Sequence, residues 1–319
     1  MSTTEISNQV QEKLHYMKTV GGVENVVLTQ KDGNPIASAG VWLSESEIFN
    51  VVAAASAIYN AGIQLHTDNM TRLVIEGQGA KILLMPLQSN PSQGAPSQMN
   101  LYEYFISITT MSNANLGNLF IKSRKSLSDI HRILVNSGLS FLPPLRDFNN
   151  KQVDSILKNF KAKDETEENY QIKCSQLSAS EELINECNGH LDMMMKMLPG
   201  IAYVSISLSG GFPLIYKFND DRFYESPANE SSLSHGIFTT SAGAAWYLKK
   251  TRIEMIHMDC RKYTHFLLPY SEGLISLYAL KGNRPLGYMK LLFPKYVEFI
   301  NKSFSKMKVQ DTFDTSFIK

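Results

Sequence analysis

The chain has 319 residues, 43% of them hydrophobic, and its 31 Lys and Arg residues nearly balance 30 Asp and Glu. This length predicts roughly two domains, and the balanced charge argues against a basic field for nucleic acid. The polar, amphipathic start does not resemble a signal peptide, and no run of about 18 apolar residues could span a bilayer. Three cysteines without CxxC spacing suit a reducing cytosol, so we expect a cytoplasmic protein.

Residues 1–137 read as one domain. An apolar stripe that repeats every three or four residues from Ile6 to Met17 predicts an amphipathic helix. The segment VVLTQKDGNPIAS then predicts a β-hairpin that turns at Gly33 and Pro35, because glycine permits the positive φ of such turns.

An alanine-rich helix, three strands and a last helix complete this first domain. The helix lies in SESEIFNVVAAASAIYNAGIQL, with Ser44 as its expected N-cap and Glu47 completing a capping box. The strands are expected in MTRLVIEG, AKILLMPL and LYEYFISITT. The polar stretch QSNPSQGAPSQMN predicts a long connection before the third of these strands.

Residues 138–180 predict a linker with one short amphipathic helix, not a third domain. They begin with LSFLPPLRD and end in the charged KAKDETEENYQ.

The same order of elements returns in residues 181–305. A helical stripe from Ile184 to Leu198 precedes a second hairpin, VSISLSGGFPLIY, which turns at Gly211 and Pro213. A second helix rich in small residues, SSLSHGIFTTSAGAAWYLKK, follows the polar loop NDDRFYESPANESS. The spacing between matched residues changes only in loops, so we interpret the chain as two copies of one unit. Residues 306–319 predict a tail that is either disordered or docks on a sheet edge or groove.

The motif GVENVVLTQKDGNPIAS, with VVAAASAIYNAG and NANLGNLFIKSRKSLSDIHRIL after it, resembles the roadblock family of the dynein light-chain type. The second copy is less similar, because Gly210 replaces the turn aspartate and Tyr216 stands where a small residue is usual. The resemblance implies an α+β fold, an α/β sandwich of two roadblock/longin-like domains. Each would be a five-stranded antiparallel sheet in the order 2-1-5-4-3, with the first and last helices on one face and the middle helix on the other. It also implies pairing through middle helices and third strands, which here would give an intramolecular pseudo-dimer with a ten-stranded sheet.

The two middle helices independently favour such pairing. They are apolar around much of their circumference, so covering their own sheets leaves further apolar surface without cover. Small residues allow two helix backbones to approach closely. We expect this inter-domain role for Ala53, Ala54, Ala57 and Ala61 in the first copy and for Thr240, Ala242, Gly243 and Ala244 in the second. The alternative is that each middle helix is buried by its own domain and the linker.

Candidate chemical motifs do not add up to an active site. The sequence HMDC, His257–Cys260, could suggest a metal or nucleophile cluster, but alternation along a strand separates His257 and Asp259 from Cys260. We interpret His257 as an ordinary strand-end histidine. The glycine pairs match neither GxGxxG nor GxxxxGK[ST], and GxSxG is absent, so we predict no catalytic residue, metal or cofactor. The run DMMMKM could line a partner groove, but helical spacing favours a core position for Met194 and Met197.

What the resemblance implies for function is a non-catalytic protein-binding module that scaffolds or regulates Ras-like small GTPases. Its partners would be a small GTPase or other roadblock/longin proteins, with membrane association only through them. Two alternatives stay open. One is a structural adaptor in a motor, trafficking or nutrient-sensing complex without GTPase contact. The other, less favoured, is a small-molecule sensor, which predicts an enclosed cavity lined by polar groups.

Overall fold

The computed structural model describes residues 3–40, 45–66, 70–87, 103–138, 180–198, 200–219, 226–249, 251–282 and 286–306. The expected N-cap Ser44, the interior of the predicted linker, the tail after Lys306 and the stretch 88–100 lie outside these ranges. No helix within them is long and apolar enough to cross a membrane.

The described residues of the first half form eight elements in the predicted order. They are α1 (Thr3–Lys18), β1 (Val23–Gln30), β2 (Pro35–Gly40), α2 (Glu45–His66), β3 (Met70–Gly77), β4 (Ala80–Pro86), β5 (Tyr104–Met111) and α3 (Leu116–Ser137). The second half repeats them as α5 (Glu181–Met197), β6 (Ile201–Leu208), β7 (Phe212–Phe218), α6 (Pro227–Lys249), β8 (Ile253–Cys260), β9 (Tyr263–Tyr270), β10 (Gly273–Leu280) and α7 (Leu286–Lys306).

Two details differ from the sequence-based expectation. Helix α6 begins at Pro227, inside the segment expected to be a polar loop, because proline is already shaped for the first helical position. Met197 is 51% exposed, whereas a core position was expected. Leu198, four residues after the buried Met194, continues the buried stripe, so Met197 lies outside it.

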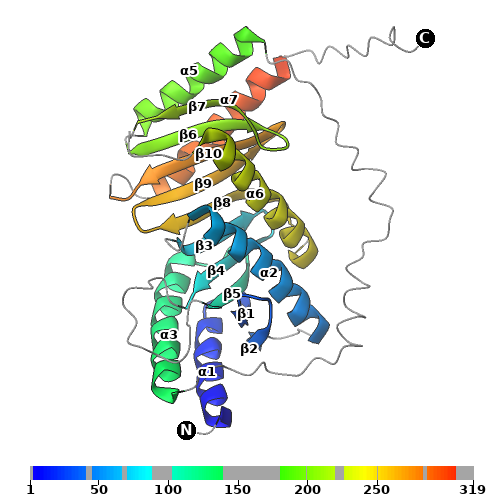
Figure 1. Ribbon diagram of the computed structural model, residues 1–319, viewed down its shortest axis with the longest axis vertical. Helices are drawn as coiled ribbons and strands as arrows, with labels where there is room; N and C mark the ends of the chain where they lie inside the picture. The colour runs from blue at the N-terminus through cyan, green and yellow to red at the C-terminus, as the bar shows by residue number, and fades with distance from the viewer. Residues whose placement is uncertain are drawn as a thin grey trace, which may run out of the picture.

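The ten strands in the described ranges form one antiparallel sheet in the order β2-β1-β5-β4-β3-β8-β9-β10-β6-β7 (Figure 1). Each half therefore has the strand order 2-1-5-4-3, and the third strands of the two halves join edge to edge. This confirms the predicted α+β fold and the ten-stranded sheet. The limits of the two domains stay a prediction, because most of the linker between the halves is not described.

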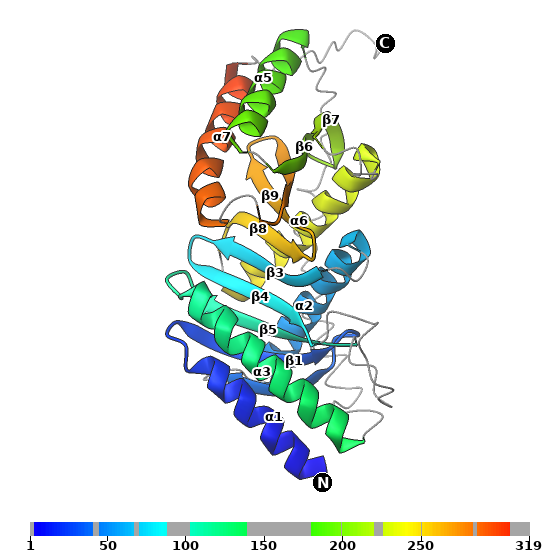
Figure 2. The same cartoon turned by 90° about the vertical axis from the view of Figure 1, so that its left-hand side faces the viewer.

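The helices form a layer on each face of the sheet (Figure 2). One core lies under α1 and α3, and a second lies under α5 and α7 on the same face. On the opposite face α2 and α6 bury a third core, and its residues come from both halves. Because this core is shared, the two halves pack as one unit.

Both hairpin turns lie against a middle helix. Gly33 and Gly211 have φ of 99° and 81°, as expected for glycine in these turns. A Cβ added to Gly211 would lie 2.9 Å from the Cα of Ser232 in α6. In the first half, the carbonyl oxygen of Lys31 accepts hydrogen bonds from Ser56 and Asn60 of α2. The prolines that follow the turns, Pro35 and Pro213, begin or nearly begin their strands.

Candidate protein-interaction surface

Helices α2 and α6 lie side by side over the junction of the two halves (Figure 1). Neither the stretch 48–65 of α2 nor the stretch 231–248 of α6 contains an Asp, Glu, Lys or Arg residue. Their inner sides share a core, to which α2 contributes Ala55, Ile58 and Tyr59 and α6 contributes Ile237, Ala244 and Ala245. The absence of charge allows both helices to bury these sides against each other and the sheet.

The eight small residues predicted to pair the helices occupy different environments. Ala244 is buried, and Ala53, Ala54, Ala61 and Ala242 are partly buried. Ala57, Thr240 and Gly243 are exposed, and a Cβ added to Gly243 would meet nothing within 4 Å. The structure thus turns three of the eight away from the shared core, and a pairing role for the other five stays a prediction.

The outer sides of these helices form what we call the α2–α6 surface, which comprises Ala57, Gln64, Thr240, Gly243 and Trp246. Trp246 is 52% exposed. In the repeat it corresponds to Ile58 of α2, which is fully buried. The five residues of this surface carry no charge, but its two halves differ by one exposed aromatic ring.

Beneath the helices, strands β3 and β8 meet about an approximate twofold axis. Val74 lies opposite His257 in the register of the two strands. These two residues are 183 positions apart, the same separation as between Met70 and Ile253, which begin the two strands. Equivalent residues of the two copies therefore face each other at the centre of the sheet.

Charged side chains join the two halves on the face that carries α3 and α7. Arg72 of β3 forms an ion pair with Asp259 of β8, and its guanidinium lies 3.9 Å from the ring centroid of Phe120 in α3. The hydroxyl of Thr264 donates to Asp259 at 2.7 Å. Burial would raise the pKa of Asp259, but Arg72 and Thr264 outweigh it and lower the pKa below its usual value.

A second ion pair, between Glu76 of β3 and Lys290 of α7, also joins the halves. His257 is fully buried, with its Nδ1 atom 3.3 Å from Oε1 of Glu76. Burial would raise the pKa of Glu76, but the contacts with His257 and Lys290 lower it to about 2. Burial lowers the pKa of His257, so its ring is neutral at pH 7 and Lys290 supplies the positive charge. His257 lies within β8, not at the strand end where it was expected.

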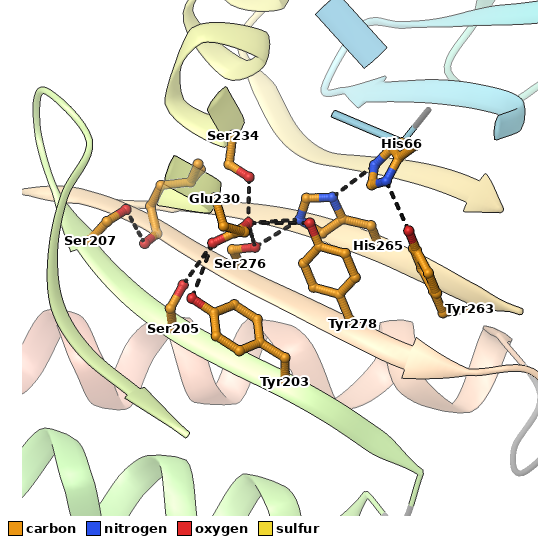
Figure 3. Close-up of polar contacts among 11 residues, drawn as sticks. His66, Tyr203, Ser205, Ser207, Glu230, Ser234, Tyr263, His265, Ser276 and Tyr278 are labelled. Atoms are coloured by element: carbon orange, nitrogen blue, oxygen red, sulfur yellow. Dashed lines mark hydrogen bonds and ion pairs between the residues drawn. The ribbon is translucent and has the colours of Figure 1, made fainter. Parts of the chain in front are cut away.

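A buried polar network lies between the sheet and α6 (Figure 3). Its centre is the carboxylate of Glu230, which is fully buried in the first turn of α6. The hydroxyls of Ser234 and Ser276 donate to Oε1 at 2.6 Å each. Those of Tyr203 and Ser205 donate to Oε2 at 3.2 and 3.4 Å. Burial raises the pKa of Glu230, while these hydrogen bonds oppose the rise.

The network continues into the first half through two histidines. Nε2 of His265 lies 2.7 Å from the hydroxyl of Ser276, and its Nδ1 lies 3.1 Å from Nε2 of His66. The Nδ1 atom of His66 lies 3.2 Å from the hydroxyl of Tyr263. Burial lowers the pKa of His265 far below its usual value and that of His66 to about 3. Each neutral ring has one donor and one acceptor nitrogen. With Glu230 ionised, each group in this series of hydrogen bonds donates to the next one toward the carboxylate: Tyr263 to His66, His66 to His265, His265 to Ser276 and Ser276 to Glu230.

The network is suited to holding the halves together, not to acting on a substrate. Glu230 and His265 have no exposed surface, and their polar atoms already contact other side chains. Burial raises the pKa of the Cys260 thiol to about 12, so it is not a ready nucleophile. Within the described ranges, no group of three His, Cys, Asp or Glu side chains could hold a metal ion.

Sequence reasoning missed this network because its members are scattered from His66 to Tyr278. One usable signal was the alternation of polar and apolar residues in YVSISLS and LISLYAL, which places Ser and Tyr on one face of two neighbouring strands, β6 and β10. Buried hydroxyl groups require hydrogen-bond partners, and the carboxylate oxygens of Glu230 accept from several of them.

No protein-family model matches the sequence, and no curated protein matches it. Several solved structures are similar to part of the chain. A Roadblock/LC7 domain from Streptomyces avermitilis is 14% identical, with 39% of this chain and 96% of that chain covered and a TM-score of 0.33. MglB from Myxococcus xanthus is 16% identical, with 42% and 100% covered and a TM-score of 0.38. The gliding protein MglB from Thermus thermophilus is 17% identical, with 39% and 93% covered and a TM-score of 0.34.

Proposed function

From two roadblock-type folds paired within one chain, we propose that this protein is a non-catalytic binding module for a Ras-like small GTPase. It would act as a scaffold or a regulator. The proposal combines the sequence resemblance with one feature of the structure, the uncharged α2–α6 surface that spans both halves.

The composition of this surface supports protein binding. The centres of protein interfaces are depleted in charged residues, and tryptophan is among the residues that contribute most to affinity. Trp246 is 52% exposed on a surface whose other members are small or polar. Because Ile58, its equivalent in the first half, is buried, a partner meets two different halves and can bind in one orientation.

The module would act on GTP turnover through the conformation of its partner. A GTPase positions its own phosphates, Mg²⁺ and attacking water, and its switch loops order or disorder with the bound nucleotide. A rigid surface that holds those loops in one arrangement changes the rate of hydrolysis or exchange without adding a catalytic side chain.

Binding of the host's small GTPases to the full chain, each loaded with GDP or a GTP analogue, tests the proposal. We expect at least one of them to bind, and Trp246→Ala to weaken that binding at least about tenfold. Leu291→Ala is the matched control, because Leu291 is 75% exposed on α7, which covers the opposite face of the sheet. Absence of binding to every GTPase in both nucleotide states would reject the proposal and favour an adaptor without GTPase contact. Equal weakening by both variants would reject the α2–α6 surface as the binding site.

A further inference from the structure

The sheet ends on one side at β7, which pairs with β6 alone among the strands the structure describes. One edge of β7 therefore presents backbone N–H and C=O groups without a strand partner, which is a template for adding another strand.

Large apolar side chains surround this edge. Phe212, Tyr216 and Phe218 of β7 are 67%, 49% and 39% exposed. Met193 and Met197 of the adjacent helix α5 are 49% and 51% exposed. The rings of Tyr216 and Phe218 already contact each other, with centroids 5.5 Å apart. Together these five residues form what we call the β7 edge patch.

The opposite edge of the sheet, at β2, is built differently. Pro35, Ile36, Ala37 and Ala39 are all buried, and no large apolar residue of β2 is exposed. Gln11 of α1 also reaches over to the carbonyl oxygen of Ser38, at 3.5 Å. The apolar edge at β7 is therefore a property of the second copy and not a general consequence of the fold.

Within β7 itself, Phe212–Phe218, no uncompensated charge would repel another strand. Edge strands often protect themselves with lysine. The single charged residue of β7 is Lys217, and it forms an ion pair with Asp192 of α5. Two copies of this edge can therefore approach without like-charge repulsion between their strands.

We propose that the β7 edge patch pairs with the same patch of a second copy of this chain. The pairing would be antiparallel about a twofold axis through the middle of β7, as closed symmetric dimers require. That geometry brings the Phe212 end of one strand beside the Phe218 end of the other. The irregular register opposite Ile206 and Ser207 puts Phe212 on one face of the sheet and Phe218 on the other, so both faces of the new pair carry exposed aromatic side chains. It continues, between chains, the edge-to-edge joining that β3 and β8 make within the chain.

The mass of the full chain in solution, measured by sedimentation over a wide range of concentrations, tests this pairing. We expect a monomer–dimer equilibrium, and we expect Tyr216→Lys to raise the dimer dissociation constant at least about tenfold. Leu291→Lys places the same charge at an exposed apolar position on α7 and should leave the constant unchanged. Hydrogen exchange on the unaltered chain gives an independent readout, in which the outward-facing amides of β7 become protected as concentration rises.

A monomer at every concentration would overturn the pairing. So would a dimer that Tyr216→Lys and Leu291→Lys weaken equally. Amides of β7 that are protected in the monomer would assign the edge to another segment of the same chain, which also overturns it.

Discussion

The Nε2 atom of His66, in the last turn of α2, lies 3.1 Å from the Nδ1 atom of His265 in β9. The two rings are nearly perpendicular, with centroids 5.1 Å apart, and both side chains are buried. This contact joins the middle helix of the first copy to the sheet of the second. One of the two rings must be neutral to accept this hydrogen bond, because a protonated imidazole has no acceptor nitrogen. Burial lowers the pKa of both rings, which favours the neutral form of each.

The first prediction concerns pH. The pKa of His66 is about 3 in the folded protein and about 6.5 for an unfolded histidine, so between these values the unfolded chain binds the proton. The contribution of the neutral His66 ring to the stability of the folded protein is therefore complete above about pH 6.5 and is lost as the pH falls toward 3. We expect His66→Gln to flatten the pH dependence of the free energy of unfolding between pH 5 and 6.5 by up to about 1.4 kcal/mol per unit.

Urea unfolding at a series of pH values measures this slope. Glu76, whose pKa is lowered to about 2, loses its own stabilisation only as the pH falls through the acidic range below about 4.5, so it does not obscure the histidine range. His15→Gln, at an exposed position of α1, is the control. An unchanged slope in His66→Gln would show that the buried ring does not govern acid sensitivity.

Much of the architecture could be predicted, because it depends on local patterns that occur twice. Gly33 and Gly211 mark the turns of the two hairpins, and both have the positive φ that the sequence predicts. The order of the strands followed from the resemblance. The ten-stranded sheet also followed from the resemblance, and the apolar middle helices independently favoured pairing of the two copies.

The polar contacts at the junction could not be predicted, because they depend on differences between the copies. Arg72 corresponds to Met255 in the second copy, and Phe120 corresponds to Lys290. As a result, the contact on one side of the junction consists of Arg72, Asp259 and the ring of Phe120. The contact on the other side is the ion pair between Glu76 and Lys290 of α7. Which of these side chains pair with one another can be seen only when their neighbours in three dimensions are known.

The second prediction concerns the Arg72–Asp259 ion pair. Asp259 has a side chain only 5% exposed, so removing Arg72 leaves a nearly buried carboxylate without its main cation. We expect Arg72→Met to lower the free energy of unfolding by about 2 kcal/mol. Arg132→Met is the matched control, since Arg132 is 72% exposed and pairs with Asp129 on the surface of α3. It should change the free energy by less than about 0.5 kcal/mol. Similar effects of both variants in urea unfolding would contradict this ranking.

The third prediction concerns the close approach of the two halves at Gly77. A Cβ added there would lie 2.7 Å from the carbonyl oxygen of Arg252 and 2.6 Å from the hydroxyl of Thr251, both in the second half. Gly77→Ala should therefore destabilise the protein by about 1–3 kcal/mol. At Gly79 the nearest atom would be 3.7 Å away, an ordinary contact, so Gly79→Ala is the control. The midpoints of thermal unfolding of the two variants test this prediction. Equal midpoints would show that the two halves do not approach each other this closely at Gly77.

The last prediction tests the shared core beneath α2 and α6. Ala245 has no exposed surface and packs with residues of both halves, so a leucine there has no free volume to occupy. We expect Ala245→Leu to cost about 1–3 kcal/mol, because the extra methylene groups force the two helices or the sheet apart. Ala57 faces outward on α2, so Ala57→Leu should leave the free energy of unfolding within about 0.5 kcal/mol of the original. Urea unfolding of the two variants separates a helix pair that is packed inside the protein from helices that only lie near each other. If Ala245→Leu were as stable as Ala57→Leu, the helices would not share a closely packed core, and the surface they form together would lose the rigidity that partner binding requires.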